Sequence, residues 1–175
     1  MVRAIVVADT SVLINFLRID RMDLIAAHPT SFIATDHVAT EITGTYPDQQ
    51  VRYAAALDAG QITEERVDDP VEMEMFLRLA AKGRLGAGER AAIAVALNRG
   101  CALAIDDSRA IQRALQEAAL GQNTLTILRT QDVMLELIRR RTISVETADT
   151  ILVDWATNHR FKLKIASFRE LLDRE

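Results

Sequence analysis

The 175-residue chain has one cysteine, Cys101, only three prolines and only seven glycines. A lone cysteine forms no internal disulfide, so a disulfide-stapled scaffold is excluded. The low proline and glycine content, with 49% hydrophobic and 26% charged residues, excludes disordered and fibrous classes. A chain of this length can bury a hydrophobic core without disulfides. We therefore expect a folded globular protein.

Long apolar runs are missing as well. No window approaches the roughly 18 consecutive apolar residues that a membrane span needs. The apolar stretch 4–8 is too short for the core of a signal peptide and is followed by Asp9. We therefore expect a soluble, cytoplasmic protein with no membrane partner.

Neither sign of charge dominates the chain. The 21 Lys and Arg residues stand against 25 Asp and Glu residues, which leaves a formal charge of −4. This balance argues against a protein whose whole surface binds nucleic acid, although a local basic strip remains compatible with it. Basic residues gather at 139–141 and at 159–164, where they either contact phosphates or are simply solvated.

Five short apolar runs predict β-strands. They are rich in β-branched residues and are separated by longer segments with helical spacing. This alternation predicts βα units, and hence an α/β fold with a mostly parallel sheet of about five strands covered by helices on both faces. The runs are residues 3–9, 31–34, 62–67, 102–105 and 125–128.

Apolar stripes and capping residues predict the helices. Asp36 is suited to cap one helix, Asp69 with Pro70 opens another, and Gly100 and Gly121 close two later ones. No linker divides the chain, so we expect one domain over residues 1–175, with a core of about 1–130 and a C-terminal helical extension of about 131–175. The predicted helices are 11–19, 36–43, 69–83, 88–99, 108–120, 131–140 and 144–158.

Carboxylates follow two of the predicted strands, with Asp9 after the first and Asp106-Asp107 after the fourth. In open α/β sheets, ligands bind beyond the carboxyl ends of the strands. Taken singly, each Asp is better explained as the cap of the helix that follows it. Two such strand ends together shift the balance toward a functional site.

Two glutamates lie on apolar faces of predicted helices. Glu89 shares a face with Ile93, and Glu41 shares one with Val38. A carboxylate on such a face must be paired, protonated or bound to a cation, because an isolated buried charge is costly. For each Glu alone, a partner such as Arg109, a side chain that reaches solvent, or helix-dipole stabilisation at Glu89 is as good an explanation as a site.

Together these positions ask for a common explanation. Carboxylates at two strand ends and on two helices would repel one another unless a hard divalent cation lay among them. Mg²⁺ or Mn²⁺ suits such an all-oxygen site. The chemistry that this indicates is phosphoryl hydrolysis by activated water.

Four motifs, in this order, resemble those of a PIN domain. They are Val-Val-Ala-Asp9-Thr-Ser-Val-Leu-Ile-Asn, Val-Ala-Thr-Glu41-Ile, Gly-Ala-Gly-Glu89-Arg-Ala-Ala-Ile-Ala-Val-Ala-Leu and Ala-Ile-Asp106-Asp107-Ser-Arg-Ala. Segments 125–130, 132–141 and 161–172 resemble the branch of PIN-like proteins often met as toxin components. The resemblance spans nearly the whole chain. Residues 129–132, Arg-Thr-Gln-Asp, depart from the Gly-Thr turn of that branch.

The resemblance implies a metal-dependent ribonuclease that acts on RNA. It also implies a homodimer and, for a toxin, a small antitoxin protein as partner. Ser11 matches a hydroxyl that steadies the first Asp or a metal-bound water in the family, and Asp107 is a candidate fifth acid. The implied catalytic residues, which hold Mg²⁺ or Mn²⁺ around an activated water, are Asp9, Glu41, Glu89 and Asp106.

Two other function classes compete with the nuclease. One is a catalytically weak PIN-like module that acts by binding a protein or RNA partner, and the presence of all the acids argues against it. The other is a carboxylate phosphohydrolase of the haloacid dehalogenase type, which needs an Asp where this chain has Ser11. The metal-dependent nuclease is therefore the first hypothesis.

Overall fold

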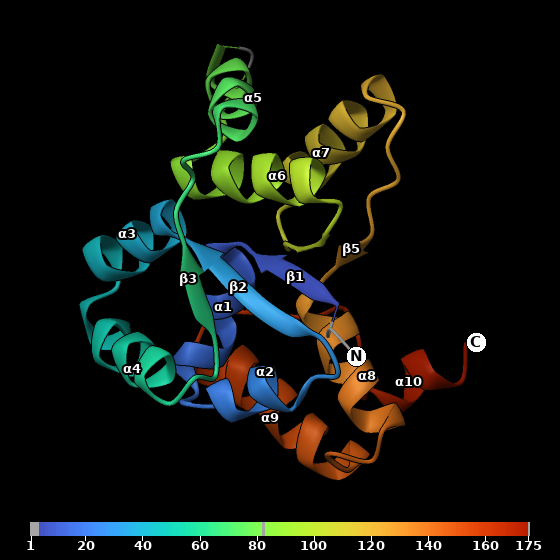
Figure 1. Cartoon of the computed structure of the whole chain (residues 1–175). Helices are drawn as coiled ribbons and strands as arrows, with labels where there is room; N and C mark the ends of the chain where they lie inside the picture. Colours follow the sequence, from blue (N-terminus) through green and yellow to red (C-terminus); the bar gives the residue numbers. More distant parts are fainter. Residues whose placement is uncertain (1–3, 82, 175) are drawn as a thin grey trace.

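A computed structural model describes residues 4–81 and 83–174. Its strands form one fully parallel sheet in the order β3-β2-β1-β4-β5, as Figure 1 shows. The predicted α/β fold with a parallel sheet of about five strands is confirmed. The strands are β1 (Ile5–Ala8), β2 (Ser31–Thr35), β3 (Thr63–Glu65), β4 (Ala102–Ala104) and β5 (Ile127–Leu128).

The strand order reverses between β1 and β4. From β1 the chain moves outward through β2 to β3, and it then returns to the other side of β1 to form β4 and β5. Val6 pairs with Ala102 and Ala8 pairs with Ala104, so the two central strands end level with each other. Parallel sheets of this kind place their ligand sites at such a switch point.

Helices connect and cover the strands. The described residues form ten: α1 (Thr10–Arg18), α2 (Met22–Ala27), α3 (Asp36–Thr45), α4 (Pro47–Asp58), α5 (Pro70–Ala81), α6 (Ala87–Arg99), α7 (Ser108–Leu120), α8 (Thr130–Arg139), α9 (Val145–Asn158) and α10 (Arg169–Leu172).

The structure differs from the sequence expectations in a few helices and one strand. Helices α2 and α4 were not predicted. Asp36 does not cap α3, because Thr35 occupies the cap position and its hydroxyl accepts the N–H of Val38 at 3.2 Å. The predicted strand over 62–67 is shorter, and residue 3 of the first predicted strand and residue 82 of the helix over 69–83 lie outside the described residues.

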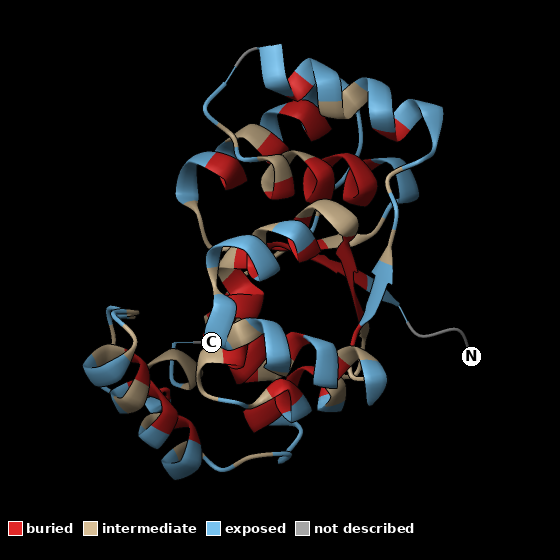
Figure 2. Ribbon diagram, turned by 90° about the vertical axis from the view of Figure 1, so that its left-hand side faces the viewer, coloured by how far each residue is buried: buried red, intermediate tan, exposed pale blue. Residues whose placement is uncertain are grey.

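Successive side chains of a strand point to opposite faces of the sheet, so a hydrophobic core forms on each face. Val6 and Ala8 of β1 face helices α1, α8 and α9, whereas Val7 between them faces α6 and α7. Figure 1 shows α5, α6 and α7 on one side of the sheet and α1, α2, α8 and α9 on the other. The buried residues in Figure 2 follow this layering, with exposed residues on the outer helix faces.

The C-terminal helices belong to the first of these cores. Trp155 of α9 is fully buried, and its indole N–H donates to the carbonyl of Asn15 in α1 at 2.8 Å. Its ring meets Phe16 and Phe161 edge-on at centroid distances of 5.8 and 5.3 Å. Helix α9 is thereby fixed against α1, the helix that starts at the end of β1. Over residues 4–81 and 83–174, no helix is both long and apolar enough to cross a membrane.

Candidate active site

Asp9 lies directly after β1 and is almost completely buried, with 1% of its surface exposed. It caps α1, because Oδ2 accepts the backbone N–H of Ser11 at 3.0 Å and its hydroxyl at 2.6 Å. Oδ1 is buried and accepts no hydrogen bond from any described residue. Burial raises the pKa of Asp9, and the negative charge of Glu41 raises it further, while the bonds from Ser11 oppose the rise.

Ser11 and Thr130 fix the second strand-end carboxylate, Asp106. The hydroxyl of Ser11, which donates to Asp9, also accepts the backbone N–H of Asp106 at 3.0 Å. Thr130 donates its N–H to Asp106 Oδ1 at 2.9 Å and its hydroxyl to Oδ2 at 2.6 Å, and Asn15 donates to Oδ2 at 3.1 Å. Burial raises the pKa of Asp106, and the Thr130 bonds oppose this.

Glu41 connects α3 to the start of α1 and to α6. Its two carboxylate oxygens accept the hydroxyl of Thr10 at 2.8 Å and the backbone N–H of Gly88 at 2.7 Å. A Cβ at position 88 would lie only 2.5 Å from Glu41 Oε2, so this approach requires a residue without a side chain. Glycine at 88 therefore allows the Glu41 carboxylate to lie against the α6 backbone.

Glu89 and Asp107 occupy the starts of two helices on the other face. Glu89 is half-buried in the first turn of α6 and accepts the N–H of Gly86 at 2.9 Å. Burial raises its pKa, and the charges of Asp9, Asp107 and Glu41 raise it further. Asp107 caps α7 by accepting the N–H groups of Arg109 and Ala110, both at 2.9 Å. The capping explanation thus holds for Asp107 and not for Asp106.

The five acids therefore gather at one edge of the sheet, but most of them already have partners. No described residue group of three or more His, Cys, Asp or Glu side chains is arranged to hold a metal ion. Arg109, considered above as a partner for the glutamates, forms no ion pair with either among the described residues. Apart from Asp9 Oδ1, the carboxylates accept hydrogen bonds mainly from hydroxyl and backbone N–H groups instead.

The donors nevertheless fit a hard divalent cation. All are carboxylate oxygens, the ligands that Mg²⁺ and Mn²⁺ prefer. Asp9 contributes a buried oxygen to which no described residue donates a hydrogen bond, which is costly unless a proton or a cation compensates it. The charge of Glu41 raises the pKa of both Asp9 and Glu89. A cation at Asp9 would relieve both costs.

Three positioning side chains escaped the sequence analysis: Thr10, Asn15 and Thr130. Thr10 and Asn15 belong to the Asp-Thr-Ser motif and the helix that follows it. The sequence signal that could have indicated a role for Asn15 is its position: a polar amide four residues after Ser11, within an otherwise apolar helix. Thr130 lies 24 residues from Asp106, and the contact exists because β5 pairs with β4.

Removal of the Thr130 hydroxyl tests its positioning of Asp106. We expect Thr130→Val to lose about 1–3 kcal/mol of unfolding free energy, because a hydrogen bond to a buried carboxylate is lost. We also expect roughly 10–100-fold weaker metal binding, the usual effect of losing a group that orients a ligand. Thr130→Ser keeps the hydroxyl and should retain most of the affinity. Equal metal titrations for Thr130→Val and the unaltered protein would contradict this role.

The pKa values of Asp9, Glu89 and Asp106 are raised, so the stability of the metal-free protein should decrease as pH rises. An acid with a raised folded-state pKa binds its proton more tightly in the folded chain, so its stabilising contribution is lost as pH rises through that pKa. In EDTA, urea unfolding in a pH series that rises from about 4, near the ordinary pKa of a carboxylate, should therefore show a steeper loss of stability than the same series for Asp9→Asn. Parallel curves for the two proteins would refute the expectation.

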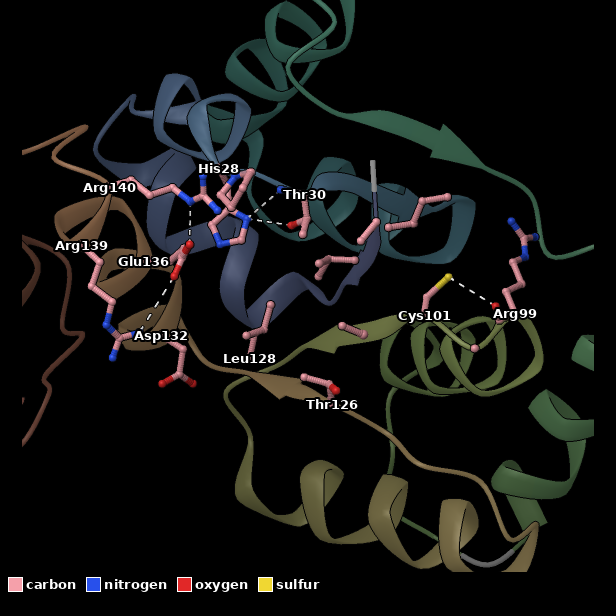
Figure 3. Close-up of a pocket in the computed structure, with 16 residues that line it drawn as sticks. His28, Thr30, Arg99, Cys101, Thr126, Leu128, Asp132, Glu136, Arg139 and Arg140 are labelled. Carbon is pink, nitrogen blue, oxygen red and sulfur yellow. Dashed lines mark hydrogen bonds and ion pairs between the residues drawn. The ribbon is translucent and has the colours of Figure 1, made fainter. Parts of the chain in front are cut away.

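One cavity of the protein lies away from the acids. A cavity of about 770 Å³ opens at the amino ends of β1 and β4 and beside the end of α8, as Figure 3 shows. Its cations are already neutralised. Arg140 and Arg139 pair with Glu136 at 2.6 and 4.0 Å, and Arg99 pairs with Glu72 at 2.6 Å. Size alone therefore does not mark the reactive edge of the sheet.

Comparisons with known proteins identify the family of the chain. A family model described as a PIN domain matches residues 5–174, and members of that family are generally metal-dependent nucleases. Among solved structures, the chain is similar to a PilT N-terminus domain protein from the hyperthermophilic archaeon Sulfolobus solfataricus P2. The two share 16% identity with a TM-score of 0.48, over 74% of this chain and 89% of that one. No curated protein matches the chain significantly.

Proposed function

This chain belongs to the PIN domain family, and from that premise we propose that it is a metal-dependent ribonuclease that hydrolyses phosphodiester bonds of RNA. The observation that carries the proposal is Asp9 Oδ1, a buried carboxylate oxygen at the switch point of the sheet that accepts no hydrogen bond from the residues that the structure describes. A structural cap needs one oxygen for the helix N–H, and Asp9 uses the other one for that purpose. The free oxygen therefore supports a ligand role.

Each acid has its own part in the proposed reaction. Asp9 and Asp106 are the central ligands for Mg²⁺ or Mn²⁺, and Glu41 and Glu89 either complete the ligand set or orient the attacking water. When bound, the cation polarises the phosphate and lowers the pKa of water. Ser11 holds the strand ends of Asp9 and Asp106 together, and Thr130 and Asn15 hold the Asp106 carboxylate in place. Asp107 acts as a fifth acid from the start of α7.

A cleavage assay tests the proposal. Purified protein is incubated with a mixture of structured and single-stranded RNAs in Mg²⁺, in Mn²⁺ or in EDTA. We expect cleavage with either metal and none with EDTA. Asp106→Asn should abolish cleavage while the protein stays folded, because Asn preserves the size of the side chain and removes the charge that binds the cation. Cleavage that persists in EDTA would contradict the metal-dependent mechanism.

The hydrogen-bonded state of the acids favours a second candidate function. Glu41, Glu89 and Asp106 each accept local donors, so metal binding has to compete with these bonds. A catalytically weak PIN-like module that acts through a protein or RNA partner needs no such competition. RNA binding by the folded protein without cleavage in Mg²⁺ or Mn²⁺ would favour this module over the nuclease.

We also propose that the chain forms one domain over residues 1–175, with its core in about 1–130 and a helical extension from about 131.

A further proposal is that the protein is the toxin of a toxin–antitoxin pair, that it forms a homodimer, and that it acts in the cytoplasm. Exposed apolar side chains on α5 and α7, namely Val71, Leu77 and Leu120, support a protein partner on that layer. Light scattering of the purified chain measures the homodimer directly.

A further inference from the structure

A second, smaller cavity of about 350 Å³ adjoins the acids. It lies between the segment joining α5 to α6 and the first turns of α7, on the side of the sheet shown with α5, α6 and α7 in Figure 1. Glu89 and Asp107 both line it, so it is continuous with the proposed catalytic site. Its other charged lining residues are all arginines: Arg84, Arg109 and Arg113.

The three arginines are not equally neutralised. Arg113 pairs with the buried carboxylate of Glu117 at 2.7 Å. Arg84 and Arg109 are exposed, and their guanidinium groups form no ion pair with any described residue. Two unbalanced cations therefore remain beside a site that a metal ion would neutralise.

Arg113 supplies an independent sign of a missing partner. Its Nε is buried and has no hydrogen-bond acceptor among the residues that the structure describes. A buried donor without an acceptor is costly, because it has lost water and gained nothing in return. Because Arg113 also lines the cavity, this donor without an acceptor lies in the wall of the cavity.

The chemistry of the lining identifies the occupant. Guanidinium groups are the preferred binders of phosphate oxygens. Leu85 is partly exposed and adds an apolar wall on which a base or ribose can lie, with the buried Leu79 behind it. The volume lies in the range of cavities that hold small organic molecules, larger than a lone phosphate needs. A duplex keeps its bases stacked inside, so a nucleotide can enter such a cavity only from a single strand.

We propose that this cavity binds the nucleotide next to the cleaved bond of a single-stranded RNA, with Arg84 and Arg109 contacting its phosphate. The inference rests on the proposed ribonuclease function and adds the place where the strand lies beside the acids and the residues that hold it. The RNA runs from the acids at Asp9 and Glu89 into the cleft between the α5–α6 segment and α7. A net charge of −4 is compatible with this, because three arginines line this one cavity.

The test measures RNA binding without catalysis. A fluorescein-labelled oligouridylate is titrated with full-length protein in EDTA across a salt series, and anisotropy gives the Kd. We expect Arg84→Gln and Arg109→Gln each to raise Kd roughly 3–10-fold and to make the salt dependence shallower by about 0.7 per lost phosphate contact. Both residues are exposed, so thermal melting should be unchanged.

Arg141→Gln is the matched control. Arg141 follows α8 at the opposite edge of the sheet, beyond Arg139 and Arg140, which line the larger cavity. It carries the same charge and is exposed, so its replacement should leave Kd and the salt slope unchanged. An equal loss of affinity in Arg141→Gln would mean that binding is spread over the surface, and would overturn the proposal.

Two further results would also overturn it. One is an unchanged Kd and salt slope in both Arg84→Gln and Arg109→Gln. The other is a loss of affinity in these variants for an oligoglutamate peptide but not for RNA, which would assign the cavity to an acidic protein segment. Failure of the ribonuclease function is a separate outcome. The unaltered protein would then bind RNA through these arginines and cut none of it in Mg²⁺ or Mn²⁺.

Discussion

Replacement of Asp9 by asparagine should abolish RNA cleavage without lowering the free energy of unfolding. The side chain keeps its size and its capping oxygen, because Asn is as good a helix cap as Asp. The substitution removes a buried negative charge. The negative charge of Glu41 repels this charge and thereby raises the pKa of Asp9. Stability in EDTA should therefore stay the same or increase.

The loss of activity should be large. Changing a group that merely orients a metal ligand typically costs 10–100-fold, so removing a ligand should cost at least about a hundredfold. Cleavage rates in Mn²⁺ and urea unfolding in EDTA provide the two measurements. Asp173→Asn, an exposed acid at the end of α10, is the matched control and should change neither. An Asp9→Asn protein that unfolds would show that the fold needs the Asp9 charge, and would contradict the expectation.

The second large effect concerns stability and lies at the end of α6. Glu72 in the first turn of α5 is 1% exposed, and it accepts bonds from Arg99 at 2.6 and 3.1 Å. Arg99 also pairs with Glu65. Arg99→Leu would leave the Glu72 carboxylate buried without its cation, so we expect a loss of about 3–5 kcal/mol of unfolding free energy.

Two comparison proteins make this expectation specific. Arg140→Leu removes an exposed pair with Glu136 and should cost no more than about 1 kcal/mol. The double variant Arg99→Leu/Glu72→Leu removes both buried charges and should recover most of the lost stability. Urea unfolding of the four proteins measures all of these differences. An Arg99→Leu protein as stable as Arg140→Leu would contradict the importance of the buried pair.

Much of the fold follows from the sequence, because parallel strands leave a direct signature. The apolar runs ending in Asp9 and in Asp106-Asp107 predict two buried strands, and parallel strands end at one edge of the sheet. The sequence pattern therefore predicts that these acids lie at the same edge. The end of α6 is also predicted directly by the sequence, because Gly100 adopts the left-handed conformation, with a φ of 64°, that ends the helix.

The missed features depend on tertiary structure or on weak local signals. Helix α2 has six residues and no side-chain cap, and α4 buries only Tyr53 and Ala56, so neither shows a clear apolar stripe. The contact of Thr130 with Asp106 requires that β5 lies beside β4, and strand order cannot be obtained from periodicity. The roles of the predicted site residues remain a proposal, which the variants of Asp9, Asp106 and Thr130 test.

The most direct test of a metal centre at Asp9 is a calorimetric titration of Mn²⁺ into metal-free protein, run in parallel with Asp9→Asn. We expect saturable binding to the unaltered protein and an affinity reduced at least about tenfold in the variant. Equal binding by the two proteins, or no binding by the unaltered protein, would contradict a divalent-cation site held by Asp9, Glu41, Glu89 and Asp106.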